Sequence, residues 1–156
     1  MAEINGIAHI ALMVTSVERS KPFYRKLFEC LGMKIVLDNE GSFYGVGGRT
    51  GIVIHQCPAE HRRARFKQGQ IGLHHFCFRA CSKNDVDEIY KLAIELEAKI
   101  IHGPQQDGFA PGYYSVLFED PDGVRLEANF IPGQGILAPG LDQIGEKDTH
   151  WAEINQ

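Results

Sequence analysis

The chain repeats itself, and this internal repeat limits its possible folds more than any other feature. Two histidines, His9 and His75, lie in similar apolar segments, and two tyrosines, Tyr24 and Tyr90, lie in similar helical stripes at the same separation in sequence. Neither half is long enough to bury a good core alone. The repeat therefore indicates two copies of one supersecondary unit that pair with each other.

Each half has the same order of expected elements. An apolar run of strand length comes first, an amphipathic helix follows a capping pattern, and three short strand candidates follow the helix. In the first half we expect a strand at 7–14, a helix that stops at Gly32, and strands at 33–38, 42–47 and 51–56. In the second half we expect a strand at 73–80, a helix capped at 82–85, and strands at 99–102, 113–119 and 124–131. Each half is thus a β-α-β-β-β unit.

The whole chain, 1–156, is interpreted as a single domain. Its parts are module 1 at about 4–56, a basic linker at 57–70, module 2 at about 71–131 and a C-terminal tail at 132–156. The linker contains the basic run His-Arg-Arg-Ala-Arg-Phe-Lys, which we interpret as a solvated connector rather than an anion clamp.

Composition and charge exclude several classes of function. The 16 basic and 20 acidic residues give a net charge of −4, which argues against nucleic acid as a partner. No apolar run approaches the roughly 20 residues that a membrane span needs. No N-terminal signal pattern is evident, so a cytoplasmic protein is expected. The four cysteines are then expected to be free thiols, most of them buried, rather than disulfides.

Four side chains at matching repeat positions form a candidate metal site. His9 matches His75 on the first strands. When residues 51–55 are aligned with 123–127, His55 matches Glu127 on the last strands. Imidazoles and a carboxylate are the ligands that divalent transition metals take in proteins. The sequence therefore predicts a site made of these four residues.

Strand alternation predicts which side chains accompany these ligands. Successive side chains point to opposite faces of a strand, so His75 and Arg79 share one face and His74 lies on the other. Arg125 likewise shares a face with Glu127. We expect His74 to be a hydrogen-bonded structural residue. Arg79 and Arg125 are candidates either for holding a substrate carboxylate or for surface ion pairs.

Two segments carry a family resemblance. The run Ser-Val-Glu-Arg-Ser-Lys-Pro-Phe-Tyr-Arg-Lys-Leu-Phe-Glu-Cys-Leu-Gly-Met at 16–33 resembles the first helix of the vicinal oxygen chelate superfamily. The run at 112–127 resembles its closing hairpin, in which Asp-Pro-Asp-Gly precedes a Glu ligand. The superfamily groups glyoxalase I, methylmalonyl-CoA epimerase, extradiol dioxygenases, fosfomycin-resistance thiol transferases and bleomycin-binding proteins. The resemblance covers about 4–131.

The resemblance implies an α+β fold in which two tandem βαβββ modules form a half-open barrel around a divalent metal. His9, His75 and Glu127 match the superfamily's two-His-one-carboxylate ligands. His55 occupies the fourth position, which is Glu in glyoxalase I and Gln in the epimerases. The implied metal is Zn, Ni, Co or Mn, or Fe in a dioxygenase, and many members of the superfamily are homodimers.

The resemblance also implies an enzyme that acts on a small oxygen-bearing molecule. The first expectation is a lactoylglutathione lyase-like isomerisation of a glutathione hemithioacetal through a metal-stabilised enediolate, with Glu127 moving the proton. The alternatives are a non-haem iron extradiol-type dioxygenase, an epimerase, and a non-enzymatic ligand-binding protein of the bleomycin-resistance kind.

Overall fold

The computed structural model describes residues 2–133 and divides the chain into two compact units. The first unit ends at Phe66 and the second begins at Lys67. Most of the predicted tail therefore lies outside the described residues. Within the described part, no helix is long and apolar enough to cross a membrane.

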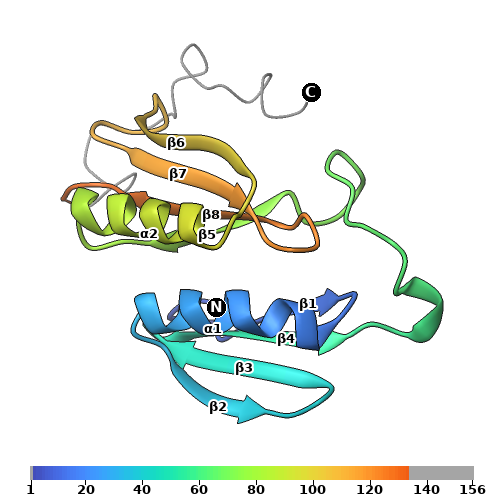
Figure 1. The fold of residues 1–156 in the computed structure, drawn as a ribbon. Coiled ribbons are helices and arrows are strands. Elements are labelled where there is room, and N and C mark those ends of the chain that lie inside the picture. The colour runs from blue at the N-terminus through green and yellow to red at the C-terminus, as the bar shows by residue number, and fades with distance from the viewer. Residues whose placement is uncertain (1, 134–156) are drawn as a thin grey trace. The chain divides into compact units, whose positions relative to one another are not determined.

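The first unit is a four-stranded mixed sheet with one helix (Figure 1). Its elements are β1 (Ile10–Val14), α1 (Val17–Cys30), β2 (Lys34–Asp38), β3 (Ser42–Gly47) and β4 (Thr50–Gln56), and a short 3-10 helix, η1 (Ala59–His61), follows. The strand order is β1-β4-β3-β2. The first and last strands are thus neighbours, and they run parallel.

The helix of this unit has clear local causes. The Ser16 hydroxyl oxygen accepts a hydrogen bond from the backbone N–H of Arg19 at 3.2 Å, which satisfies one of the free donors of the first turn. Gly32, with φ of 63°, follows the last turn in the left-handed conformation that favours glycine. The buried stripe of α1 packs on the sheet, where the rings of Phe28 and Phe43 stack at 5.7 Å.

The second unit repeats this architecture. Its elements are β5 (His75–Arg79), α2 (Lys83–Glu95), β6 (Ile100–Gln106), β7 (Tyr114–Glu119) and β8 (Arg125–Phe130), in the strand order β5-β8-β7-β6. Its helix begins with a matching cap, in which the Ser82 hydroxyl accepts from the N–H of Asp85 at 3.2 Å. The two capping serines, Ser16 and Ser82, have the same separation in sequence as His9 and His75. The helix packs on one face of the sheet, against residues of β6, β7 and β8.

The predicted fold class is confirmed, because both units are βαβββ modules with four-stranded sheets. The largest differences in boundaries are that β1 begins at Ile10 instead of residue 7 and that β6 continues to Gln106 instead of 102. How the two modules sit around a shared centre stays a prediction.

The cysteines test one expectation directly. All four lie in the described part of the chain and are free, as predicted. Only Cys57 is buried, however, so the expectation of burial was wrong for Cys30, Cys77 and Cys81.

The close approach of α1 to β3 gives a stability prediction. A Cβ atom placed at Gly45 would lie 2.5 Å from a ring carbon of Phe28, a fully buried side chain. Gly45→Ala should therefore lower the free energy of unfolding by about 1–3 kcal/mol, because an overfilled core must shift to admit the methyl group. Urea unfolding of the full chain measures this loss.

Gly41→Ala is the matched control for this substitution. The nearest atom to a Cβ at Gly41 is the Asn39 side-chain oxygen at 3.9 Å, an ordinary contact. If the two variants were equally stable, the packing of Phe28 against β3 would not be as tight as described.

Candidate metal and active site

The capping serines establish which residues of the two units are equivalent. Ser16 and Ser82 begin equivalent helices, and the same offset in sequence makes His9 equivalent to His75. His75 is the first residue of β5, and His9 directly precedes β1 and is exposed. Each histidine thus lies at the start of the first strand of its unit.

In the second unit, the parallel pairing of β5 with β8 brings two predicted ligands together. The register places Arg125 opposite His75 and Glu127 opposite Cys77. Glu127 is therefore diagonal to His75 on the same face of the sheet. The His75 Nε2 and Glu127 Oε2 atoms are 2.9 Å apart.

Glu127 is a buried carboxylate with a hydrogen bond to each oxygen. It is 7% exposed, and the Tyr113 hydroxyl donates to its Oε1 atom at 2.5 Å. Burial alone would raise the pKa of Glu127. The hydrogen bonds from His75 and Tyr113 outweigh burial and hold this pKa below its usual value, so the carboxyl group is ionised at neutral pH.

Tyr113 is a site residue that the sequence did not indicate. Its hydroxyl accepts a hydrogen bond from Asn129 Nδ2 at 2.9 Å while it donates to Glu127. Burial and the negative charge of Glu127 raise the pKa of Tyr113, so the hydroxyl keeps its proton. Alternation along the predicted strand at 113–119 does place Tyr113 on the face of Glu127, because Leu117 lies opposite Glu127. The candidates drawn from the sequence were imidazole, carboxylate and guanidinium groups, so this tyrosine was missed.

The backbone before Tyr113 is fixed by close packing. Gly112 has a positive φ of 75°, and a Cβ atom there would lie 2.8 Å from a ring carbon of Pro132. The N–H of Tyr113 donates to the carbonyl oxygen of Ala110 at 3.0 Å. This turn directs the Tyr113 side chain onto the sheet face that carries Glu127.

The neighbouring histidine contacts the candidate ligand. The Nδ1 atoms of His74 and His75 are 2.6 Å apart, and the rings meet edge to face at 4.9 Å. Alternation predicted that the two rings would lie on opposite faces. That expectation does not hold because His74 lies outside β5, so strand geometry does not govern its direction. The prediction that His74 is hydrogen-bonded is confirmed.

Cys77 lies on the same face, between His75 and Arg79 in sequence. Although part of the residue is exposed, its sulfur lies beside the Glu127 carboxylate. Burial of the sulfur and the charge of Glu127 both raise the pKa of the thiol. Cys77 is therefore a neutral thiol at neutral pH.

His55 has a different position from the one that the sequence alignment assumed. The register of β1 with β4 places Val53 opposite Ala11 and His55 opposite Met13. Because Ala11 is equivalent to Cys77, Val53 is the residue equivalent to Glu127. The alignment of 51–55 with 123–127 was thus wrong by two residues.

The hairpins that precede the last strands also differ between the two units. Gly47 pairs with Thr50, so only two residues join β3 to β4, whereas Glu119 pairs with Arg125, so five residues join β7 to β8. His55 lies about 7 Å farther along β4 than Val53. Its Nδ1 atom is 2.7 Å from the Ser42 hydroxyl. Metal binding by His55 stays a prediction.

The two candidate substrate-binding arginines differ in environment. Arg125 is 6% exposed, and its Nε atom lies 3.8 Å from a carboxylate oxygen of Glu119, which also receives Lys99 Nζ at 3.1 Å. Arg79 is exposed at the end of β5, opposite Asn129. Arg125 thus has an ion-pair partner, but the pair is buried and not the surface pair that the sequence analysis considered. A substrate-binding role of either residue stays a prediction.

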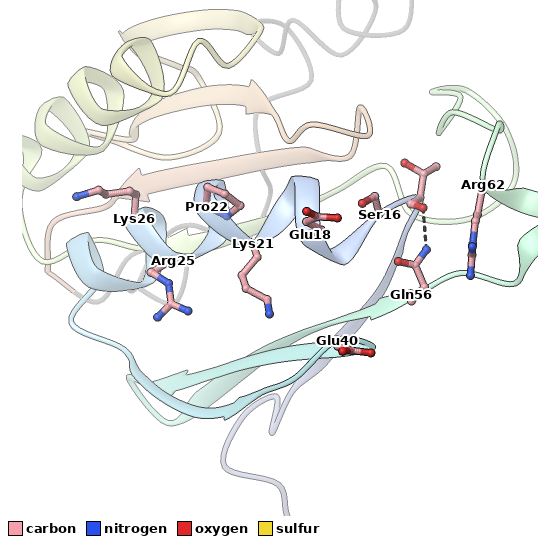
Figure 2. Close-up of a pocket in the computed structure, with 10 residues that line it drawn as sticks. Ser16, Glu18, Lys21, Pro22, Arg25, Lys26, Glu40, Gln56 and Arg62 are labelled. Carbon is pink, nitrogen blue, oxygen red and sulfur yellow. Dashed lines mark hydrogen bonds between the residues drawn. The ribbon is translucent and has the colours of Figure 1, made fainter.

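A groove of about 900 Å³ lies elsewhere, along α1 of the first unit (Figure 2). Lys21 and Arg25 line it, and both pair with the Asp38 carboxylate. The Gln56 side chain, which donates to the carbonyl oxygen of Thr15 at 2.7 Å, is also at its edge. None of the predicted metal ligands lines this groove, so it is not the candidate site.

Comparison with known proteins decides the family. The model of the Glyoxalase/Bleomycin resistance protein/Dioxygenase superfamily matches residues 6–128. The chain belongs to this superfamily. The match includes parts of both units, all three candidate histidines and Glu127.

The chain is similar to several named relatives and to proteins of known structure. The chain is 26% identical over 126 residues to a metallothiol transferase FosB of Shouchella clausii, with 81% of this chain and 80% of the relative covered. It is 29% identical to the metallothiol transferase FosB of Staphylococcus haemolyticus, with 94% and 96% covered. Among solved structures, a putative glyoxalase from Bacillus halodurans matches with a TM-score of 0.68 at 24% identity, covering 80% of this chain and 94% of that one. At that identity the structural match supports the fold alone.

The turn between β7 and β8, which precedes the strand that carries Glu127, gives a prediction about stability. Asp120 is 5% exposed, and its Oδ1 atom accepts from the N–H groups of Asp122 at 2.9 Å and Val124 at 2.8 Å. Asp120→Ala should lower the free energy of unfolding by about 2 kcal/mol or more, because two buried donors lose their acceptor. Asp120→Asn keeps a carbonyl acceptor and should lose clearly less. Equal stability of the alanine variant and the unmodified chain in urea unfolding would contradict this role.

Proposed function

We propose that the chain is a divalent-metal-dependent enzyme that joins a small thiol to an oxygen-bearing electrophile. The observation that carries the proposal is the pairing of the His75 imidazole with the buried, ionised carboxylate of Glu127 at 2.9 Å. The names of the relatives support the choice of a thiol, since the FosB proteins, at 26–29% identity, are metallothiol transferases.

The residues present fit a divalent ion. One imidazole nitrogen and one carboxylate oxygen face each other, and the other carboxylate oxygen is occupied by Tyr113. Within the described part of the chain, no group of three His, Cys, Asp or Glu side chains is close enough to hold an ion. We therefore propose that His75 and Glu127 are joined by His9 of the first unit, contributed either by the same chain or by the other chain of the predicted homodimer.

In the proposed reaction the ion and the protein's own residues would have different roles. A bound divalent ion would supply Lewis-acid polarisation of a substrate oxygen. His75 and Glu127 hold the site in place, with one negative charge from the carboxylate. The thiol sulfur forms a bond to the carbon while the carbon–oxygen bond breaks, and the thiol proton ends on the released oxygen. Arg79 or Arg125 would pair with an anionic group of the substrate.

A second candidate is the isomerisation of a glutathione hemithioacetal. One observation favours it: Glu127 is an ionised carboxylate beside a protonated hydroxyl, Tyr113, which suits a group that moves a proton at carbon. The proton would leave the carbon that carries sulfur and hydroxyl for Glu127 and return to the neighbouring carbonyl carbon, while the hydroxyl proton moves to the former carbonyl oxygen. The product is a 2-hydroxy thioester that retains the thiol of the hemithioacetal.

Metal content tests the ligand set. The purified full chain should bind one divalent ion, and His75→Ala should reduce the metal content to background, because the pair with Glu127 is lost. His9→Ala should do the same. His55→Ala should keep its metal, since the strand registers make Val53, and not His55, the residue equivalent to Glu127. Elemental analysis measures the content.

The same measurement separates the alternatives. Loss of metal in His55→Ala would support the four-ligand set that the sequence predicts. Bound iron, together with oxygen consumption when catechols are added, would favour the dioxygenase. Exchange of a carbon-bound proton of a substrate with solvent, without addition of a thiol, would favour the epimerase. A protein that bound no metal yet bound a ligand tightly would support the non-enzymatic alternative and overturn the proposal.

Thiol consumption tests the reaction. With metal bound, the protein should consume a low-molecular-weight thiol in the presence of an epoxide, and the rate should return to the uncatalysed value when a chelator removes the metal. Both reactions consume free thiol, so the product decides between them: a thioether formed from the epoxide would support the transfer, and a thioester formed from a 2-oxoaldehyde would instead establish the isomerisation.

A further inference from the structure

Glu127 has two oxygens, and the structure assigns them to different partners. Its Oε2 atom faces His75 Nε2, and its Oε1 atom accepts a hydrogen bond from the Tyr113 hydroxyl. A carboxylate can bind a cation through one oxygen or through both. The partner of Oε2 is itself a proposed ligand, so a bound ion would replace that contact, whereas the Tyr113 hydroxyl would compete with an ion for Oε1.

The Tyr113 hydroxyl is itself held in one direction. A hydroxyl has one proton to donate, and the Asn129 side-chain N–H points at the oxygen of Tyr113 from 2.9 Å. The hydroxyl proton is therefore directed to Glu127. The ring is 9% exposed and packs against Phe109 with the ring centres 5.1 Å apart. The two hydrogen bonds thus run in one direction, from Asn129 to Tyr113 and from Tyr113 to Glu127.

We propose that Tyr113 is a positioning residue that restricts Glu127 to metal ligation through Oε2 alone. The inference rests on the proposed function, because it concerns the metal site of that function. The consequence is that one coordination position, which the second carboxylate oxygen would otherwise occupy, is kept for a substrate oxygen. Hydrogen-bonded partners of ligating carboxylates orient the ligand and are worth about 10–100-fold in metal affinity.

The experiment is a cobalt(II) titration of the metal-free full chain, followed by absorption spectroscopy at saturating metal. Tyr113→Phe keeps the ring and its packing on Phe109 but removes the hydroxyl. We expect cobalt affinity to fall by about 10–100-fold. We also expect the visible bands of the saturated protein to weaken, because binding through both oxygens raises the coordination number.

Tyr114→Phe is the matched control. Tyr114 is the next residue, and its hydroxyl donates to Asp87 on α2 at 2.8 Å rather than to the site. This variant loses one hydroxyl and one hydrogen bond as well, and it should retain the affinity and spectrum of the unmodified protein. Asn129→Ala is the second test variant, since it removes the donor to Tyr113 but leaves the ring in place. It should shift both readouts in the same direction as Tyr113→Phe, by a smaller amount.

The outcomes distinguish this inference from the function on which it rests. If the unmodified protein binds no cobalt, the proposed function is wrong, and the inference about Tyr113 is then wrong as well. If the unmodified protein binds cobalt but Tyr113→Phe has the same affinity and the same spectrum, only the positioning role is overturned. A Tyr113→Phe protein that melts at a lower temperature but has an unchanged saturated spectrum would mean that the hydroxyl is merely structural, which also overturns the inference.

Discussion

The parallel pairing of the first strand with the last strand is the constraint on which each unit depends. Two parallel neighbours cannot be joined by a tight turn, so the chain must cross over, and here the crossover contains the helix and the β2–β3 hairpin, or β6–β7 in the second unit. The helix packs on one face of the sheet, and in the second unit the other face carries His75, Cys77 and Glu127. Since β5 and β8 are neighbours, His75 and Glu127 meet at 2.9 Å although they lie far apart in sequence.

The sequence predicted much of this arrangement because the signals were local and repeated. Apolar runs, capping serines and Gly32 each act within a few residues, so the elements could be located without knowledge of the rest of the fold. The constant offset between the two halves then linked His9 with His75, and the identical caps at Ser16 and Ser82 confirm that equivalence. Facing was also predictable inside a strand, which is why Glu127 and His75 were expected on the same face.

The errors at the candidate site concern three residues. His55 was matched to Glu127 by aligning residues 51–55 with 123–127, but the strand registers make Val53 the residue equivalent to Glu127. His74 lies directly outside β5, where alternation makes no statement about direction. Tyr113 does follow alternation onto the face of Glu127, and it was missed because a tyrosine is not among the usual metal ligands.

The electrostatics of Glu127 explain why its surroundings are so polar. A buried carboxylate without partners would be protonated, and a protonated ligand binds metal poorly. His75 and Tyr113 supply hydrogen bonds that lower the pKa of Glu127, while the same negative charge raises the pKa of Tyr113 and of Cys77. The cluster thereby gathers its negative charge on one residue. With two imidazoles and this single carboxylate, a divalent ion would keep a net charge of about +1, which favours an anionic oxygen or a thiolate as the next ligand. A remaining charge of this sign is compatible with the thiol and the oxygen-bearing electrophile of the proposed function.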